Sequence, residues 1–104
     1  MTRELVQILL PLADNEGRSF GETLFQTVKQ ELAERFGGVT AFTQSPAEGL
    51  WQEAGEGTAR DQIVIFEVMA EDIDDSWWRD YRREMERRFD QEQIVVRALP
   101  IRLL

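Results

Sequence analysis

Residues 62–70, Gln-Ile-Val-Ile-Phe-Glu-Val-Met-Ala, are apolar at nearly every position apart from Glu67. A run of this length that is rich in β-branched residues predicts a strand. Because this strand offers almost no polar face to water, we expect it to lie in the centre of a sheet, covered on both sides.

Three more strands and two helices are predicted around this run. Residues 3–12, 39–44 and 93–99 have the apolar or alternating patterns of strands. One helix is expected between Ser19, which has the capping-box spacing to Glu22, and the glycine stop at 37–38. A second helix is expected after its cap at Asp74. It carries an apolar stripe of Trp78, Tyr81, Met85 and Phe89. Residues 45–60 are interpreted as a loop or small hairpin, and Pro100 as the start of an extended tail.

These elements divide into two strand-helix-strand halves. Two right-handed crossovers of this kind interleave most simply as a four-stranded antiparallel sheet with both helices on one face. We therefore predict an α+β, ferredoxin-like β-α-β-β-α-β fold with strand order 4-1-3-2. A chain of 104 residues is expected to form a single domain, residues 1–104.

Three stretches of the chain carry a resemblance to known proteins. They are RSFGETLF at 18–25, ERFGGVTAF at 34–42 and SPAEGLW at 45–51. Together they resemble a family of small bacterial proteins that have a ferredoxin-like fold, similar to dimeric α/β barrels, and no assigned activity. The resemblance implies the fold and adds no catalytic motif.

The composition excludes several classes of function. Twenty acidic residues against twelve basic ones give a net charge of -8, which argues against binding to nucleic acid or to an anionic membrane. The absence of Cys and His removes thiolate nucleophiles, zinc-thiolate sites and the commonest general base. The acidic residues 71–75 are interpreted as a helix start and not as a metal site. We expect neither a cofactor nor a metal.

The N-terminal residues do not have the pattern of a signal peptide, and no apolar stretch reaches the length of a membrane span. The default expectation is a soluble cytoplasmic protein.

Alternation along the strands divides their side chains between two faces of the sheet. One set is entirely apolar and is predicted to face the helices: Val6, Ile8, Leu10, Val64, Phe66, Val68, Ile94, Val96 and Ala98. The other set is apolar at seven of ten positions: Leu5, Gln7, Leu9, Ile63, Ile65, Glu67, Met69, Val95, Arg97 and Leu99. A face of this composition must be covered, since a solvated face would be polar at nearly every outward position.

Three covers are possible for this second face. They are the 45–60 loop with Trp51, the C-terminal tail, or a second copy of the protein docked sheet to sheet. We favour a homodimer, because an exposed apolar patch of several hundred Å² usually marks an interaction site.

Three polar residues, Gln7, Glu67 and Arg97, are expected to meet on this face. A charge on an otherwise apolar surface must pair, bind a ligand or reach water. One interpretation is an ion pair that sets the dimer register. The other is a small cavity in which Arg97 holds an anionic or carbonyl group and Glu67 acts as a base. Trp51 is interpreted as core packing, a lid on the face or a dimer anchor.

Two functional classes follow from these patterns. The first is a non-catalytic dimeric binding or assembly module with no catalytic residues. The alternative is a small cofactor-independent enzyme, of the oxygenase or isomerase type, acting on an apolar small molecule in a cavity on the open face. An enclosed void beside Glu67 would favour the enzyme, and a tightly packed interface the module.

Overall fold

The computed structural model of the chain describes residues 3–44 and 62–104. The elements follow the order β1 (Arg3–Pro11), α1 (Glu22–Phe36), β2 (Thr40–Gln44), β3 (Ile63–Glu71), α2 (Asp75–Arg88) and β4 (Val95–Ile101). Among these described residues, no helix is both long and apolar enough to cross a membrane.

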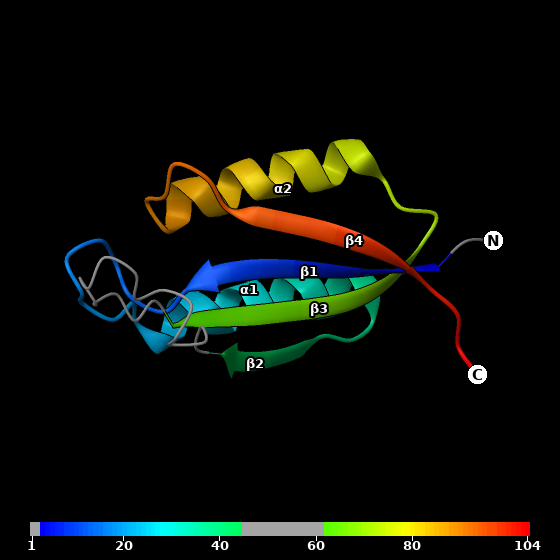
Figure 1. Cartoon of the computed structure of the whole chain (residues 1–104), viewed down its shortest axis with the longest axis horizontal. Helices are drawn as coiled ribbons and strands as arrows, with labels where there is room; N and C mark the ends of the chain where they lie inside the picture. Colours follow the sequence, from blue (N-terminus) through cyan, green and yellow to red (C-terminus); the bar gives the residue numbers. More distant parts are fainter. Residues whose placement is uncertain (1–2, 45–61) are drawn as a thin grey trace, which may run out of the picture.

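The four strands form one antiparallel sheet in the order β2-β3-β1-β4. Read from the other edge, this is the predicted order 4-1-3-2. In Figure 1, α1 lies behind β1 and β3, so the view is onto the face of the sheet that α1 does not cover. The ferredoxin-like β-α-β-β-α-β fold is therefore confirmed. The prediction that residues 62–70 lie inside the sheet is also confirmed, because β3 pairs with β2 on one side and β1 on the other.

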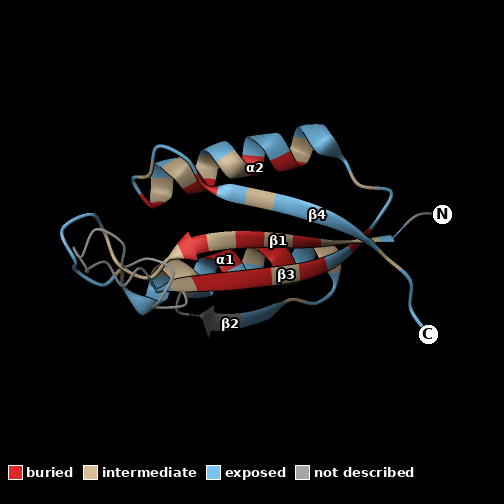
Figure 2. Ribbon diagram, viewed as in Figure 1, coloured by how far each residue is buried: buried red, intermediate tan, exposed pale blue. Residues whose placement is uncertain are grey.

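The core lies between the sheet and the two helices (Figure 2). It uses the alternate side chains of β1 and β3 that the sequence assigned to the helix face. The predicted stripe of α2 is buried as well, with Met85 and Phe89 fully inaccessible. From α1, Val28 and Leu32 complete the core. Burial of each such side chain contributes about 1.5–3 kcal/mol, so this layer holds the helices on one face.

The two helix starts differ in how well they were predicted. The Asp74 cap is confirmed, because its Oδ1 accepts a hydrogen bond from the backbone N–H of Trp77 at 3.1 Å. The capping box at Ser19 is wrong: α1 begins at Glu22, after Gly21, and has no side-chain cap. Ser19 instead forms a β-bridge with Ala13, which keeps its backbone extended and the helix start two residues further on.

The boundary at Pro100 was also predicted wrongly. Strand β4 continues through Pro100 to Ile101, and Pro100 is paired in register with Glu4 of β1. Because β4 is an edge strand, the N–H that proline lacks is not needed on its outer side. The strand therefore runs two residues past the predicted end at Leu99.

Candidate functional site

The face of the sheet away from the helices, called here the open face, is built of rows that run across the strands. The register places Ile65, Leu9 and Val95 side by side in one row, on β3, β1 and β4. The central row is Glu67, Gln7 and Arg97. The third row is Met69, Leu5 and Leu99. The open face therefore consists of a polar row between two apolar rows.

The three polar residues of the central row are connected by hydrogen bonds. Gln7 Nε2 donates to Glu67 Oε2 at 2.6 Å, and Arg97 Nε donates to Gln7 Oε1 at 2.7 Å. The alternation along the strands predicted that these residues meet, and they do. Within the chain, however, the amide of Gln7 lies between the two charges and links them. An amide suits this position because it can donate to a carboxylate and accept from a guanidinium at the same time.

A further charged pair lies at one end of the open face. Arg3 Nη2 lies 3.1 Å from Glu71 Oε2, and the two residues are paired in register on β1 and β3. Both side chains are close to half exposed, so this ion pair contributes little to stability.

The third row is open to solvent at both of its ends, whereas the first row is open only at its β4 end, because Ile65 on β3 is 4% exposed. Met69 is 53% exposed, Val95 45% and Leu99 44%. The other large hydrophobic side chains that the described residues expose are Leu103 and Leu104, at the C-terminal end. Because these two leucines are themselves exposed, and the chain runs away from the sheet after β4 in Figure 1, the C-terminal tail, one of the three possible covers, does not cover this face. Trp51 and the 45–60 segment, the other intrachain cover considered, lie outside the described residues.

A shallow hollow of about 200 Å³ lies between α2 and β4. Its walls include Arg79, Arg82 and Arg97 above an apolar floor. Glu67 and Gln7 are not among its lining residues. The hollow therefore does not bring together the acid, the amide and the guanidinium that the enzyme alternative requires.

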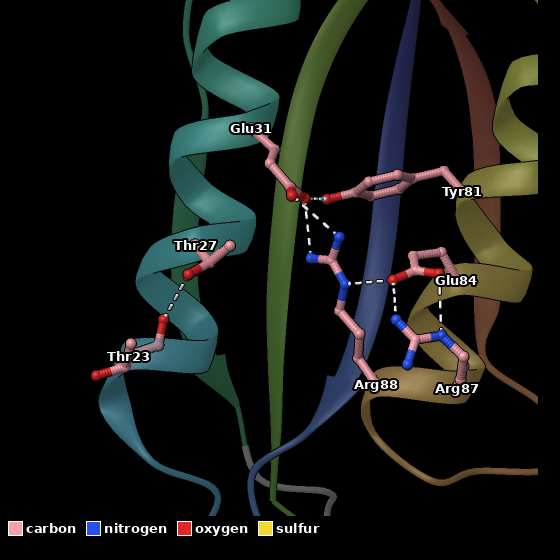
Figure 3. A network of polar contacts seen from close by, with 7 residues as sticks. All are labelled: Thr23, Thr27, Glu31, Tyr81, Glu84, Arg87 and Arg88. Carbon is pink, nitrogen blue, oxygen red and sulfur yellow. Dashed lines mark hydrogen bonds and ion pairs between the residues drawn. The ribbon is translucent and has the colours of Figure 1, made fainter.

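A second polar cluster joins the two helices, and no pattern in the sequence predicted it (Figure 3). Arg88 of α2 donates from both Nη atoms to the two carboxylate oxygens of Glu31 on α1, at 2.9 and 3.0 Å. The Tyr81 hydroxyl donates to the same carboxylate at 2.9 Å. Arg88 Nε also donates to Glu84 Oε2, four residues earlier on α2, at 2.8 Å. Arg88 therefore links a local partner to one 57 positions away.

These contacts change the acidity of the cluster. Hydrogen bonds from Arg88 lower the pKa of Glu31 below its usual 4.5, against the opposing effect of burial. Hydrogen bonds from Arg87 and Arg88 lower the pKa of Glu84 to about 2. Burial raises the pKa of Tyr81 above its usual 10, and the bond to Glu31 raises it further. The cluster thus holds fixed charges and a protonated phenol, which suits a structural clamp between helices and leaves no group positioned for acid–base catalysis near neutral pH.

Comparison with known proteins adds no functional assignment. No protein-family model matches the chain, and none of the curated proteins matches it.

Proposed function

We propose that this protein is a non-catalytic binding or assembly module that pairs with a second copy of itself through the open face. The observation that carries the proposal is the placement of exposed apolar side chains. Among residues 3–41 and 62–104, whose side chains the structure describes, every large exposed hydrophobic residue apart from the C-terminal leucines lies on this face. Apolar surface concentrated in one place marks an interaction site, whereas scattered single residues do not.

The polar row is compatible with burial in such an interface. Glu67, Gln7 and Arg97 are already linked to one another through two hydrogen bonds. Burying them against a second copy therefore costs less than burying isolated polar groups would. Covering roughly several hundred Å² of apolar surface per subunit, at about 25 cal/mol per Å², corresponds to several kcal/mol before the costs of association.

The experiment is sedimentation equilibrium of the full chain from submicromolar to high micromolar concentration. We expect a reversible dimer. Leu99→Gln and Met69→Gln should each weaken it at least tenfold, because each places an amide in an apolar row. Ala98→Gln is the matched control, since Ala98 is exposed and adjacent to Leu99 but lies on the opposite face of β4.

A wild-type chain that stays monomeric at high micromolar concentration would overturn the proposal. Equal weakening by Ala98→Gln and Leu99→Gln would also overturn it, because the effect would then not depend on the face. Circular dichroism of each variant at the same concentrations separates loss of assembly from loss of folding.

A further inference from the structure

The central row of the open face has an acidic side chain at one end and a basic side chain at the other. Glu67 on β3 and Arg97 on β4 lie on opposite sides of Gln7, which is on β1. Adjacent strands are about 4.8 Å apart, so the strands that carry Glu67 and Arg97 are separated by roughly 10 Å across the sheet. The charge on the face is therefore distributed asymmetrically about β1, and a second copy can dock so that opposite charges meet.

Docking two identical faces against each other requires a two-fold axis in the plane between them. If that axis ran across the strands through the central row, Glu67 would lie over Glu67 of the second copy, and Arg97 over Arg97. If it ran along the strands between β3 and β1, Arg97 would lie over Thr40. Only an axis along β1 places Glu67 over Arg97 of the second copy, and it does so twice. Opposite charges across an interface fix its register, and like charges cost several kcal/mol.

The third row, which is apolar, is matched by the same axis. It lays Met69 on β3 over Leu99 on β4 of the second copy, and the reverse. These two residues are the exposed members of their row, at 53% and 44%. Leu5 lies on β1 between them, so it meets its own copy at the axis. The charges therefore select this arrangement, and the exposed apolar pair of the third row agrees with it.

We propose that the second copy docks with its two-fold axis along β1, so that Glu67 of each subunit pairs with Arg97 of the other. This inference rests on the proposed function, since it gives the geometry of that assembly. Aligned sheet packing turns the two sets of strands by about 30°, which tilts each β1 by roughly 15° from the axis and keeps the rows in contact.

The test uses charge reversal in two chains. Glu67→Arg and Arg97→Glu are each expected to raise the dimer dissociation constant at least tenfold, because each makes two like-charged contacts. An equimolar mixture of the two variants should restore a heterodimer close to wild-type affinity. In that mixture, each substituted position 67 faces a substituted position 97, and both native residues also face each other.

Net charge provides an internal control. Glu67→Arg makes the chain less acidic than its net charge of -8, so general repulsion between subunits falls. Weakening of the dimer by this variant therefore cannot come from total charge. Glu92→Arg and Arg83→Glu, at exposed positions away from the sheet, are the matched reversals and should leave the dissociation constant within about twofold of wild type.

The outcomes separate the geometry from the proposed function. A wild-type dimer whose affinity is unchanged by both reversals at 67 and 97 overturns the axis along β1 and leaves the self-assembly proposal standing. A wild-type monomer overturns the proposed function itself. If a reversed chain fails to fold by circular dichroism, Glu67→Gln and Arg97→Gln replace it; each should weaken the dimer severalfold, and no weakening by either overturns the inference.

Discussion

Gln7 donates its side-chain N–H to the carboxylate of Glu67, 2.6 Å away on the neighbouring strand. The same amide accepts from Arg97, so a single side chain on β1 connects the two charges of the open face. Gln7 is therefore the residue that holds the side chains of Glu67 and Arg97 in their positions within the polar row.

Replacement of Gln7 by Leu is expected to lower the free energy of unfolding by about 1–2 kcal/mol. Two hydrogen bonds to charged groups are lost, and the added apolar area of Leu offsets only part of that loss. Urea denaturation at fixed protein concentration measures this loss. A double-mutant cycle with Glu67→Gln should give a coupling of about 0.5 kcal/mol or more. Strictly additive effects would contradict a bonded row.

Glu31→Gln is expected to destabilise the fold by about 1 kcal/mol at pH 7, a figure reduced because the carboxylate is partly exposed. The pKa of Glu31 is lowered in the folded chain, so the ionised form is favoured there. Its contribution is therefore fully present above the usual value of 4.5 and is lost as the pH falls below it. The stability difference between wild type and variant should shrink over that range.

Glu34→Gln is the control for this measurement. Glu34 is exposed on the same helix and accepts one hydrogen bond, from Gln30 at 3.3 Å. It should change stability by less than about 0.5 kcal/mol. A difference between wild type and Glu31→Gln that stays constant from pH 7 to pH 3 would contradict the assigned role of the carboxylate.

Titration of the phenol provides a third prediction. The chain contains one tyrosine, so tyrosinate absorbance reports Tyr81 alone. Its pKa should lie above the usual 10 because of burial first and the bond to Glu31 second. Since the folded state holds this proton more tightly than the unfolded state, stability should fall as the pH rises above 10.

Glu31→Gln should bring the Tyr81 titration closer to 10 without reaching it, because burial of the ring remains. A native chain that titrates at the ordinary value, while circular dichroism still reports the folded state, would refute the interhelix contact.

Asp74→Ala is expected to cost about 1 kcal/mol, measured by thermal or urea unfolding, because the N–H of Trp77 loses its acceptor at the start of α2. Asp75→Ala is the matched control: it removes the same charge from the same first turn, but Asp75 is not the residue that caps the helix. If the two variants are equally destabilised, the effect comes from the helix dipole and not from the cap.

Much of this fold could be predicted from the sequence because the signals for it are local. The apolar run at 62–70, the stripe of α2 and the cap at Asp74 each depend on spacing within one element, and each is confirmed. The failures at Ser19 and Pro100 share a cause. In each case backbone pairing with a residue outside the predicted element, Ser19 with Ala13 and Pro100 with Glu4, outweighed the local preference of the residue.

Gln7, Glu67 and Arg97 could be assigned to one face from alternation alone. Their bonding could not, because the register of β1 against β3 and β4 determines which residues lie opposite each other. The clamp of Glu31 and Arg88 was missed for a related reason. Helical spacing gives Arg88 a partner four residues away, whereas Glu31 lies on the other helix and comes within reach only when both helices pack on the sheet.

The order of polar and apolar residues along the chain was thus sufficient to determine the elements, their connection and the apolar character of both sheet faces, because these follow from periods of 2 and 3.6 residues. Tertiary structure alone determined that the amide of Gln7 separates the two charges, and that the three rows run straight across β3, β1 and β4. The physical reason is that hydrogen bonds between strands set a register over 60 or more positions of separation, which no local pattern specifies.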